Sequence, residues 1–265
     1  MYVAFDVETT GLVAGVDRIV ELAAVSFQGN DVLDSFAALV DPGMPMPPEI
    51  TTVNGITDDM LRGRPPVGDL LPAFLSFLSR GTPVAHNAEF DVSFVVAELE
   101  RRGLPAPGGP VLDTRLLARR AYPGRVSYSL ANLTRDLSIT VDGAHRALAD
   151  SLSCMRLFTA CVAALFPGEE PAPEAVAKRA GEPIDFTAHA PRGPRIAALV
   201  KKAIDGGGVL LITYRSAKGE LTERRIRPLS FTNTGGRIGV VAWCYLREEE
   251  RTFQLGSIVE ARETQ

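Results

Sequence analysis

YVAFDVETTGL, residues 2–12, is the stretch of sequence that decides the fold. Apolar side chains at every second position from Val3 to Val7 predict a β-strand that begins almost at the first residue. Residues two apart on a strand point the same way, so Asp6 and Glu8 project from one face. Their Cα atoms are expected to lie roughly 6.5 Å apart.

Two carboxylates on one face of an apolar strand are costly to bury without a partner. A hard divalent cation is the natural partner for such oxygen ligands. The alternative is a strand end at which Asp6 and Glu8 simply meet water. A D-x-E triplet arises often by chance, so the pair alone does not separate these two interpretations.

Composition is ordinary for a globular protein. The 265 residues are 46% hydrophobic and 23% charged, enough for one large domain or two smaller ones. No apolar run approaches the length needed to span a bilayer, and the N-terminus shows no signal-peptide pattern. Three cysteines without metal-ligand spacing favour a reducing, cytoplasmic location. Cys154 and Cys161, seven apart in a helical pattern, are expected in the core.

Charge is unevenly distributed around a net value of −4. Residues 1–166 carry more acids than bases, which is compatible with a metal site. Residues 192–265 carry more bases than acids, which is compatible with a polyanionic partner or with ordinary surface variation.

The order of predicted elements indicates an α/β domain. Three strands joined by short connections come first, at about 2–8, 18–27 and 32–40. Residues 51–58 are interpreted as a turn that leads into a short helix. Strand–helix alternation follows a helix at 67–78, which predicts a mixed sheet flanked by helices. The later strands are expected at 83–85 and 111–112, and the later helices at 89–102, from 114, at 129–137 and at 144–166.

The remaining sequence predicts a linker and a second domain. Proline-rich segments bracket residues 169–193, which we interpret as a linker with one short helix at 174–180. One helix, 195–204, precedes four strands that suggest a small, curved β-sheet or barrel. These strands are expected at 209–214, 221–229, 237–246 and 252–259. The predicted domains are therefore 1–168 and 194–265.

Two further motifs carry acids and histidines, HNAEFD (86–91) and HRALAD (145–150). Asp91 falls in the first turn of a helix, where the helix dipole favours negative charge. The alternative is an acid that stabilises the start of the helix and has no further role. Asp150 heads an otherwise apolar helix stripe that includes Cys154. His145 is about 140° from Asp150 around a regular helix, so we expect it on the preceding loop or a frayed turn. Capping or plain surface exposure is the alternative for this histidine.

Together the three motifs resemble those of the DEDDh family of 3′→5′ exonucleases, in particular the epsilon proofreading subunit of bacterial DNA polymerase III. Asn54-Gly-Ile-Thr also resembles that subgroup's His-Gly-Ile-Thr turn, with Asn54 in place of the histidine. The resemblance implies a ribonuclease H-like fold, and two divalent ions, Mg²⁺ or Mn²⁺, held by four carboxylates. It implies that His145 is the general base. The implied metal ligands are Asp6, Glu8, Asp91 and Asp150.

The resemblance also implies substrate contacts and partners. The expected substrate is the 3′ end of single-stranded DNA, released as nucleoside 5′-monophosphates, with a DNA polymerase or repair proteins as partners and no membrane association. An exoribonuclease acting on short RNAs, or a non-catalytic protein that binds nucleic acid or senses a ligand, is the alternative. Leu12 is expected to pack on the terminal base, although it can equally be a core residue. The implied substrate-binding residues are Thr9, Thr10, Leu12, Asn54, His86, Asn87 and Phe90.

Residues 208–215, 225–229 and 241–253 resemble a WYL domain, a small Sm- or SH3-like β-barrel that binds nucleic acid or a nucleotide-like ligand. The eponymous Trp-Tyr-Leu positions fall here on Ile238-Gly239-Val240, a large departure. Arginine beside aromatic residues suits single-stranded nucleic acid. Alternatively, Trp243 is a core residue and the arginines pair with nearby glutamates. The candidate patch is Tyr214, Arg225, Arg227, Arg247 and Arg251.

Overall fold

The computed structural model describes residues 1–141, 146–181, 184–187, 192–234 and 237–264. The chain divides into two compact units. One comprises Met1–Thr10 with Ile19–Ala188, and the other comprises Gly11–Arg18 with His189–Gln265. His145, the expected general base, lies outside the described residues.

A six-stranded mixed sheet forms the centre of the first unit, in the order β3-β2-β1-β4-β5-β6. β1 pairs antiparallel with β2, which pairs antiparallel with β3, while β1, β4 and β5 run parallel. The predicted meander followed by parallel strands is therefore confirmed. The strands are β1 (Tyr2–Thr9), β2 (Ile19–Gln28), β3 (Asp31–Leu39), β4 (Thr82–Ala85), β5 (Pro110–Asp113) and β6 (Ile184–Asp185).

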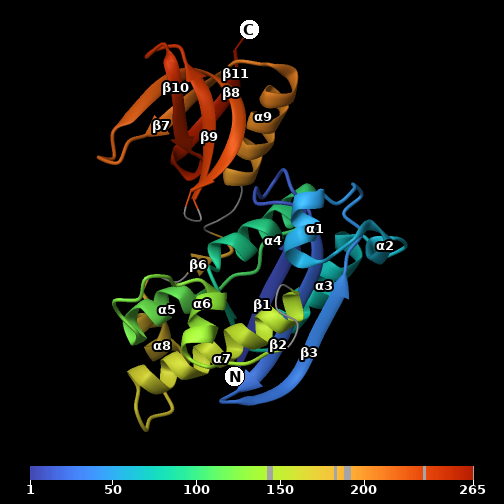
Figure 1. Ribbon diagram of the computed structural model, residues 1–265, viewed down its shortest axis with the longest axis vertical. Helices are drawn as coiled ribbons and strands as arrows, with labels where there is room; N and C mark the ends of the chain where they lie inside the picture. Colours follow the sequence, from blue (N-terminus) through green and yellow to red (C-terminus); the bar gives the residue numbers. More distant parts are fainter. Residues whose placement is uncertain (142–145, 182–183, 188–191, 235–236, 265) are drawn as a thin grey trace. The chain divides into compact units, whose positions relative to one another are not determined.

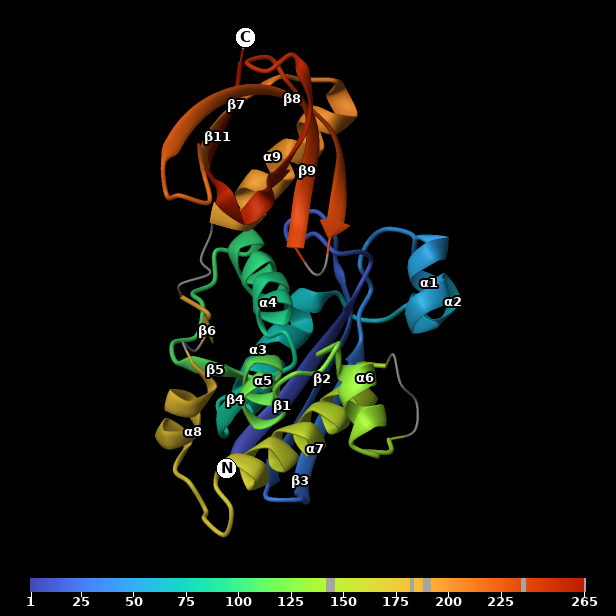
Figure 2. The ribbon, with the colours of Figure 1, turned by 60° about the vertical axis from the view of Figure 1, so that its left-hand side comes forward.

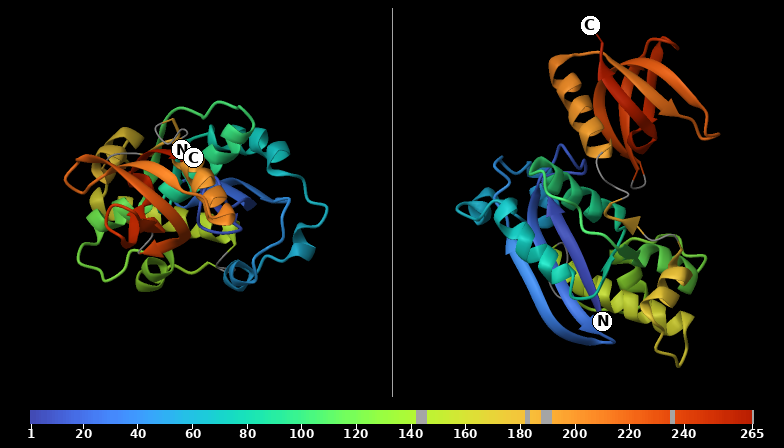
Figure 3. Two further views of the ribbon diagram at one scale, coloured as in Figure 1. Left: turned by 90° about the horizontal axis from the view of Figure 1, so that it is seen from above. Right: turned by 180° about the vertical axis from the view of Figure 1, so that it is seen from behind.

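Alternation along β1 divides its side chains between two helical layers. Tyr2 and Ala4 pack toward the long helix α7 (Ala147–Leu165), which lies across β1 and β2 (Figures 1 and 2). Phe5 points to the opposite face, where its ring meets Phe74 of α3 (Val67–Leu78). The view from behind shows α3 and α4 (Glu89–Arg101) on that second face (Figure 3). Asp6 and Glu8 share the face of Tyr2 and Ala4, so they project toward the α7 side.

A helix replaces the turn predicted at 51–58. Pro48 begins α1 (Pro48–Asn54), and Gly55 ends it in the left-handed region at φ 70°. Proline at the first helical position and glycine just past the last are favourable helix ends, a signal that the turn interpretation missed. The short helix expected next is present as α2 (Asp58–Leu61). Two further helices of this unit are α5 (Thr114–Ala121) and α6 (Leu130–Asp136).

The segment interpreted as a linker contains two elements that belong to the first unit. Val176 and Ala180 of α8 (Pro173–Ala180) pack into the same buried cluster as α7. β6 then pairs antiparallel with β5 through Pro110 and Val111. α8 thus extends the first unit's core, and β6 extends its sheet.

The second unit is an antiparallel sheet covered by one helix, α9 (Arg192–Gly206). Ile196, Val200 and Ala203 of α9 pack on its inner face. The predicted fourth strand, 252–259, is instead two, because Leu255–Ser257 forms a 3₁₀ turn that contains Gly256. The strand order β10-β9-β8-β7-β11 leaves β10 and β11 as edges, so the described pairings make a sheet and no closed barrel. The strands are β7 (Leu210–Arg215), β8 (Leu221–Thr234), β9 (Arg237–Cys244), β10 (Glu249–Gln254) and β11 (Ile258–Glu263).

Among the described residues, only α7 is long and apolar enough to cross a membrane by length and composition. It does not need a bilayer to explain its sequence. Leu157 and Cys161 are fully buried in the first unit's core, against the sheet that α7 covers.

We expect Leu157→Ala to lower the free energy of unfolding of the first unit by about 2–5 kcal/mol, because it opens a cavity in a close-packed core. Urea unfolding of the full chain, followed by far-ultraviolet circular dichroism, measures this. Leu116→Ala in α5 is the matched control, since Leu116 is a helical leucine at the surface. An equal loss in both variants would contradict this account of the core.

Candidate active site

Three carboxylates from two elements gather on the α7 side of β1. Ligand oxygens of Asp6, Glu8 and Asp150 all lie within 4.8 Å of one another. The strand supplies two of them because residues two apart share a face. The helix supplies the third because Asp150 is in the first turn of α7, which packs across β1.

Asp91 reaches the same strand from α4 and is buried, with 2% of its surface exposed. Its Oδ1 accepts a hydrogen bond of 3.0 Å from the main-chain N–H of Val7, which lies between Asp6 and Glu8. β4 pairs with β1 only from Tyr2 to Ala4, so Asp91 meets β1 beyond the end of that pairing. Its second oxygen is not committed to Val7.

Burial and mutual repulsion disfavour ionisation of these acids. Burial raises the pKa of Asp6 well above its usual range, and the charges of Asp91 and Asp150 raise it further. Burial also raises the pKa of Asp91 well above its usual range, although the Val7 hydrogen bond opposes this. The pKa of Glu8 is raised to about 7 by burial and then by Asp150.

A fifth carboxylate lies beside the cluster. Glu21 is the β2 residue directly opposite Glu8, and its side chain is only 5% exposed. Arg146 donates to both Glu21 oxygens, from Nε at 3.0 Å and from Nη2 at 2.7 Å. The main-chain N–H of Ala147, the first residue of α7, donates to Glu21 at 3.0 Å.

Asp113 organises the turn that leads into α4. It caps α5 by accepting from the Arg115 N–H at 2.8 Å. It also accepts from the main-chain N–H groups of Asn87 and Ala88, at 3.0 and 3.2 Å. Asn87 holds φ at 63°, an uncommon conformation for a side-chain-bearing residue, and its Oδ1 accepts from Arg115 Nη1. Asp113 therefore fixes the turn from which Asp91 is presented.

The predicted substrate-binding residues divide into inward and outward groups. Thr9 and Thr10 are buried, and Asn54 donates to Glu8 Oε2 at 3.4 Å while its Oδ1 accepts from the Ile56 N–H. Leu12 is 44% exposed, which removes the core alternative for it. Asn54 thus contacts a carboxylate of the cluster directly.

His86 and Phe90 are held within the first unit. His86 Nε2 donates to the Tyr128 carbonyl at 3.0 Å, which leaves Nδ1 to accept from the Thr114 hydroxyl at 2.8 Å. Burial lowers the pKa of His86, which agrees with a neutral ring. Both ring nitrogens are committed to the protein, so His86 supports the turn before α4. The Phe90 ring packs on Phe94, one helical turn further along α4.

The donor set fits divalent cations. Asp6, Glu8 and Asp150 converge, and the raised pKa values of Asp6 and Glu8 show that the protein alone does not favour their ionised forms. Oxygen-only ligands are those that Mg²⁺ and Mn²⁺ prefer. A bound cation would favour the ionised forms that burial disfavours.

Residues 3–158, more than half of the chain, match the Exonuclease family. This chain belongs to the exonuclease family. The exonuclease is 41% identical over 164 residues to DNA polymerase III subunit epsilon of Treponema pallidum, a match that covers 61% of the chain and 76% of that protein. This protein is a 3′→5′ exonuclease. Residues 195–263 of the exonuclease match the WYL domain, so the faint second resemblance is also confirmed.

The exonuclease domain is also similar to part of a much longer protein and to the whole of a shorter one. It is 39% identical over 150 residues to DNA polymerase III PolC-type of Bacillus cereus, covering 57% of the chain but only 10% of that polymerase. Exonuclease X, solved with 5′-overhanging duplex DNA, superposes with a TM-score of 0.53 at 30% identity, covering 68% of this chain and all of that one.

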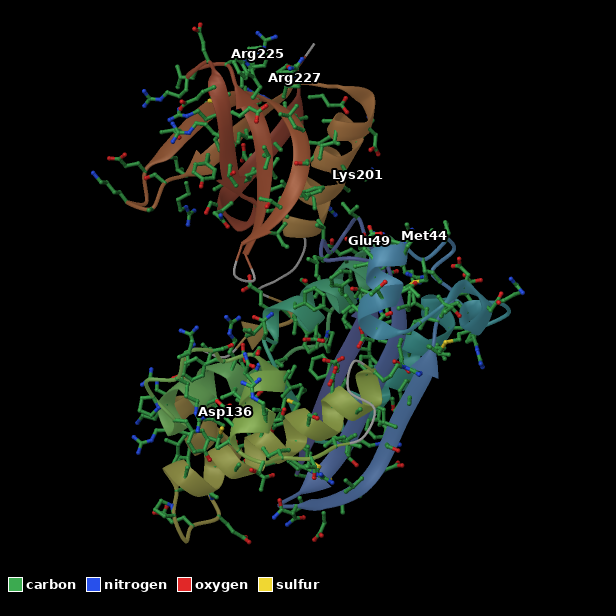
Figure 4. The ribbon with its side chains drawn as sticks, in the orientation of Figure 1. Met44, Glu49, Asp136, Lys201, Arg225 and Arg227 are labelled. Atoms are coloured by element: carbon green, nitrogen blue, oxygen red, sulfur yellow. The ribbon has the colours of Figure 1, made fainter. Side chains whose placement is uncertain are left out.

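The five residues of the predicted nucleic-acid patch do not share one face of the second sheet. Tyr214 lies on the inner side, where its ring meets Phe253. Arg225 pairs across the strands with Leu211, and Arg227 with Trp243, which places both arginines on the outer side with partly exposed Trp243 (Figure 4). Trp243 is therefore no core residue. Arg251 pairs with Glu249, as the alternative for the arginines expected.

Sequence reasoning missed Glu21 and Arg146. Glu21 is a single acid within the apolar run IVELAAV (19–25), a pattern that signals a buried, partnered charge. Its partner lies 125 residues away, next to the HRALAD motif. No local pattern links the two.

In the absence of divalent cations, we expect the exonuclease to lose stability as the pH rises from about 4.5 to about 7. Across this range Glu8 ionises in the unfolded chain but stays protonated in the folded one, so the folded state binds more protons. Thermal unfolding in EDTA measures the trend, and Glu8→Gln should flatten it. A slope identical in both proteins would contradict the raised pKa of Glu8.

Proposed function

We propose that this protein is a divalent-cation-dependent 3′→5′ exonuclease that removes nucleotides one at a time from the 3′ ends of single-stranded DNA. The observation that carries the proposal is the convergence of ligand oxygens of Asp6, Glu8 and Asp150 within 4.8 Å. Among the described residues, no other group of acids, histidines or cysteines forms such a cluster. Asp91, bound to Val7 within the same stretch of β1, completes the set of four carboxylates.

Asp6, Glu8, Asp91 and Asp150 would hold two divalent cations. When bound, these ions would activate a water molecule and stabilise the attacking and leaving oxygens at phosphorus. The chain's own contribution is to fix the carboxylates before substrate arrives. Val7 orients Asp91 through its main-chain N–H, and Asn54 orients Glu8 through its amide.

His145 would take the proton from the attacking water. The water oxygen forms a bond to the terminal phosphorus, and the bond to the 3′ oxygen of the preceding nucleotide breaks, releasing a nucleoside 5′-monophosphate. An imidazole has an unperturbed pKa near 6.5, which suits proton transfer at neutral pH. The sequence supports this role, because His145 belongs to the same HRALAD motif as Asp150, whose carboxylate is part of the acidic cluster.

Relatives support a DNA substrate and a polymerase partner. The similar protein from Treponema pallidum is named as the epsilon subunit of DNA polymerase III, and exonuclease X was solved with DNA. We propose that Thr9, Thr10, Leu12, Asn87 and Phe90 surround the terminal nucleotide. We propose a cytoplasmic role in DNA replication or repair.

The second domain, beginning near residue 194, would bind the single strand or a nucleotide-like ligand. Its outer face supports this, because Arg225 and Arg227 are exposed there, and the Arg225 guanidinium lies 4.9 Å from the Tyr245 ring centroid. Arginine and aromatic groups contact phosphates and stack on bases. At the eponymous WYL positions, a Cβ added to Gly239 would lie 2.7 Å from Thr252 Cγ2, so that position has no room for the family's tyrosine.

We expect Asp6→Asn or Asp150→Asn to reduce degradation of a 3′-ended DNA oligonucleotide by about 10²–10³-fold or more, since each removes charge that stabilises the transition state. End-labelled DNA and matched RNA oligonucleotides, each incubated with Mg²⁺, Mn²⁺ or EDTA, measure activity, substrate and metal together. DNA should be degraded faster than RNA, and EDTA should abolish both reactions.

Asp136→Asn is the control for that experiment. Asp136 is a carboxylate at the surface of α6 that pairs with Arg125, and its variant should keep full activity (Figure 4). Wild-type rates in Asp6→Asn or Asp150→Asn would refute the assignment. Faster degradation of RNA would keep the chemistry and make the enzyme an exoribonuclease.

We expect the double variant Arg225→Ala, Arg227→Ala to weaken binding of single-stranded DNA and to reduce its dependence on salt, because two phosphate contacts are removed. Fluorescence anisotropy in EDTA, at two or more salt concentrations, measures this in the full chain. Lys201→Ala, Lys202→Ala removes the same charge from α9 and should leave affinity nearly unchanged (Figure 4). Equal losses in both double variants would argue against a site on the outer face.

A further inference from the structure

Helix α7 has no cap of its own, although its first turn carries Asp150. The residue before it, Arg146, is extended, with φ −134° and ψ 132°, and its side chain makes no capping hydrogen bond. Helix N-termini leave main-chain N–H groups without partners inside the helix, and a nearby side-chain oxygen usually accepts from them. Arginine offers no such oxygen.

Glu21 supplies the missing acceptor from another element. One of its oxygens, Oε2, accepts from the Ala147 N–H, and both oxygens accept from the Arg146 guanidinium. A carboxylate at a helix N-terminus is also favoured by the helix dipole. β2 therefore holds two successive residues of the HRALAD motif through one buried side chain.

The same contacts lead directly to the carboxylate cluster. The main-chain N–H of Asp150 donates to the Arg146 carbonyl at 3.0 Å, the hydrogen bond that starts α7. On the strand side, Glu21 lies directly opposite Glu8 in the β1–β2 register. The Glu21–Arg146 ion pair thus connects the strand position next to Glu8 with the helix turn that carries Asp150.

We propose that Glu21 and Arg146 are positioning residues of the exonuclease, which set the first turn of α7 against β1 and thereby place Asp150. The inference rests on the proposed metal-ligand role of Asp150. The bidentate geometry of the Arg146–Glu21 contact matters as well as its charge. A guanidinium donates to both oxygens of a carboxylate in one plane, whereas an ammonium is a point charge. Arg146 also offsets the negative charge of Glu21 next to Glu8.

The test uses the full chain and three variants. Glu21→Gln keeps the side chain's shape, Arg146→Lys keeps the charge, and Asp150→Asn checks the ligand role itself. The turnover number and KM on a single-stranded DNA oligonucleotide are measured, together with Mn²⁺ binding in the absence of DNA by electron paramagnetic resonance. Asp34→Asn and Arg80→Lys alter an exposed ion pair of the same unit and serve as matched controls.

We expect Glu21→Gln and Arg146→Lys each to lower the turnover number or the Mn²⁺ affinity by about 10–100-fold, the scale for groups that orient metal ligands. KM should change less than twofold and the controls should resemble wild type. A purely structural pair predicts a lower melting temperature with unchanged Mn²⁺ affinity and turnover number, which would overturn the inference. Full activity in Asp150→Asn would instead refute the proposed function, so the two failures are distinguishable.

Discussion

Repulsion among carboxylates crowded on one face of β1 is the constraint on which the rest of this site depends. Three of them converge within 4.8 Å, and burial disfavours the ionised forms of Asp6 and Glu8. A chain gains nothing in stability from such an arrangement, because every ionised group lacks part of its hydration. Its persistence in the fold is understandable if cations occupy the cluster while the enzyme works.

The surrounding structure holds each acid by a separate rigid contact. Asp91 is fixed to β1 by the Val7 N–H, Glu8 contacts Asn54 at the end of α1, and Asp113 holds the turn that presents α4. Glu21 and Arg146 tie α7 to β2. Two of these supports, Glu21 and Asp113, are themselves buried acids, and each accepts three hydrogen bonds from the protein. That division separates acids available to a cation from acids that serve the fold.

The second unit shows how strand alternation sorts residues that are close in sequence. Tyr214 of β7 and Arg225 of β8 lie on adjacent strands. The Tyr214 ring packs on the inner side, whereas the Arg225 side chain is exposed on the outer face. A candidate ligand face is therefore narrower than the run of arginines and aromatics indicated. It centres on Arg225, Arg227 and Trp243.

The sequence by itself determined the order of elements, the strand that carries Asp6 and Glu8, and the three motifs, because alternation, helical spacing and motif order are local properties of the chain. It also located α8 within the segment taken for a linker, and it missed α1 despite Pro48 and Gly55. Only the tertiary structure decided which acids converge, that His86 is committed to Tyr128 and Thr114, and that Glu21 partners a residue 125 positions away. The physical reason is that a buried charge selects its partner by proximity in the folded chain, and no local pattern records that proximity.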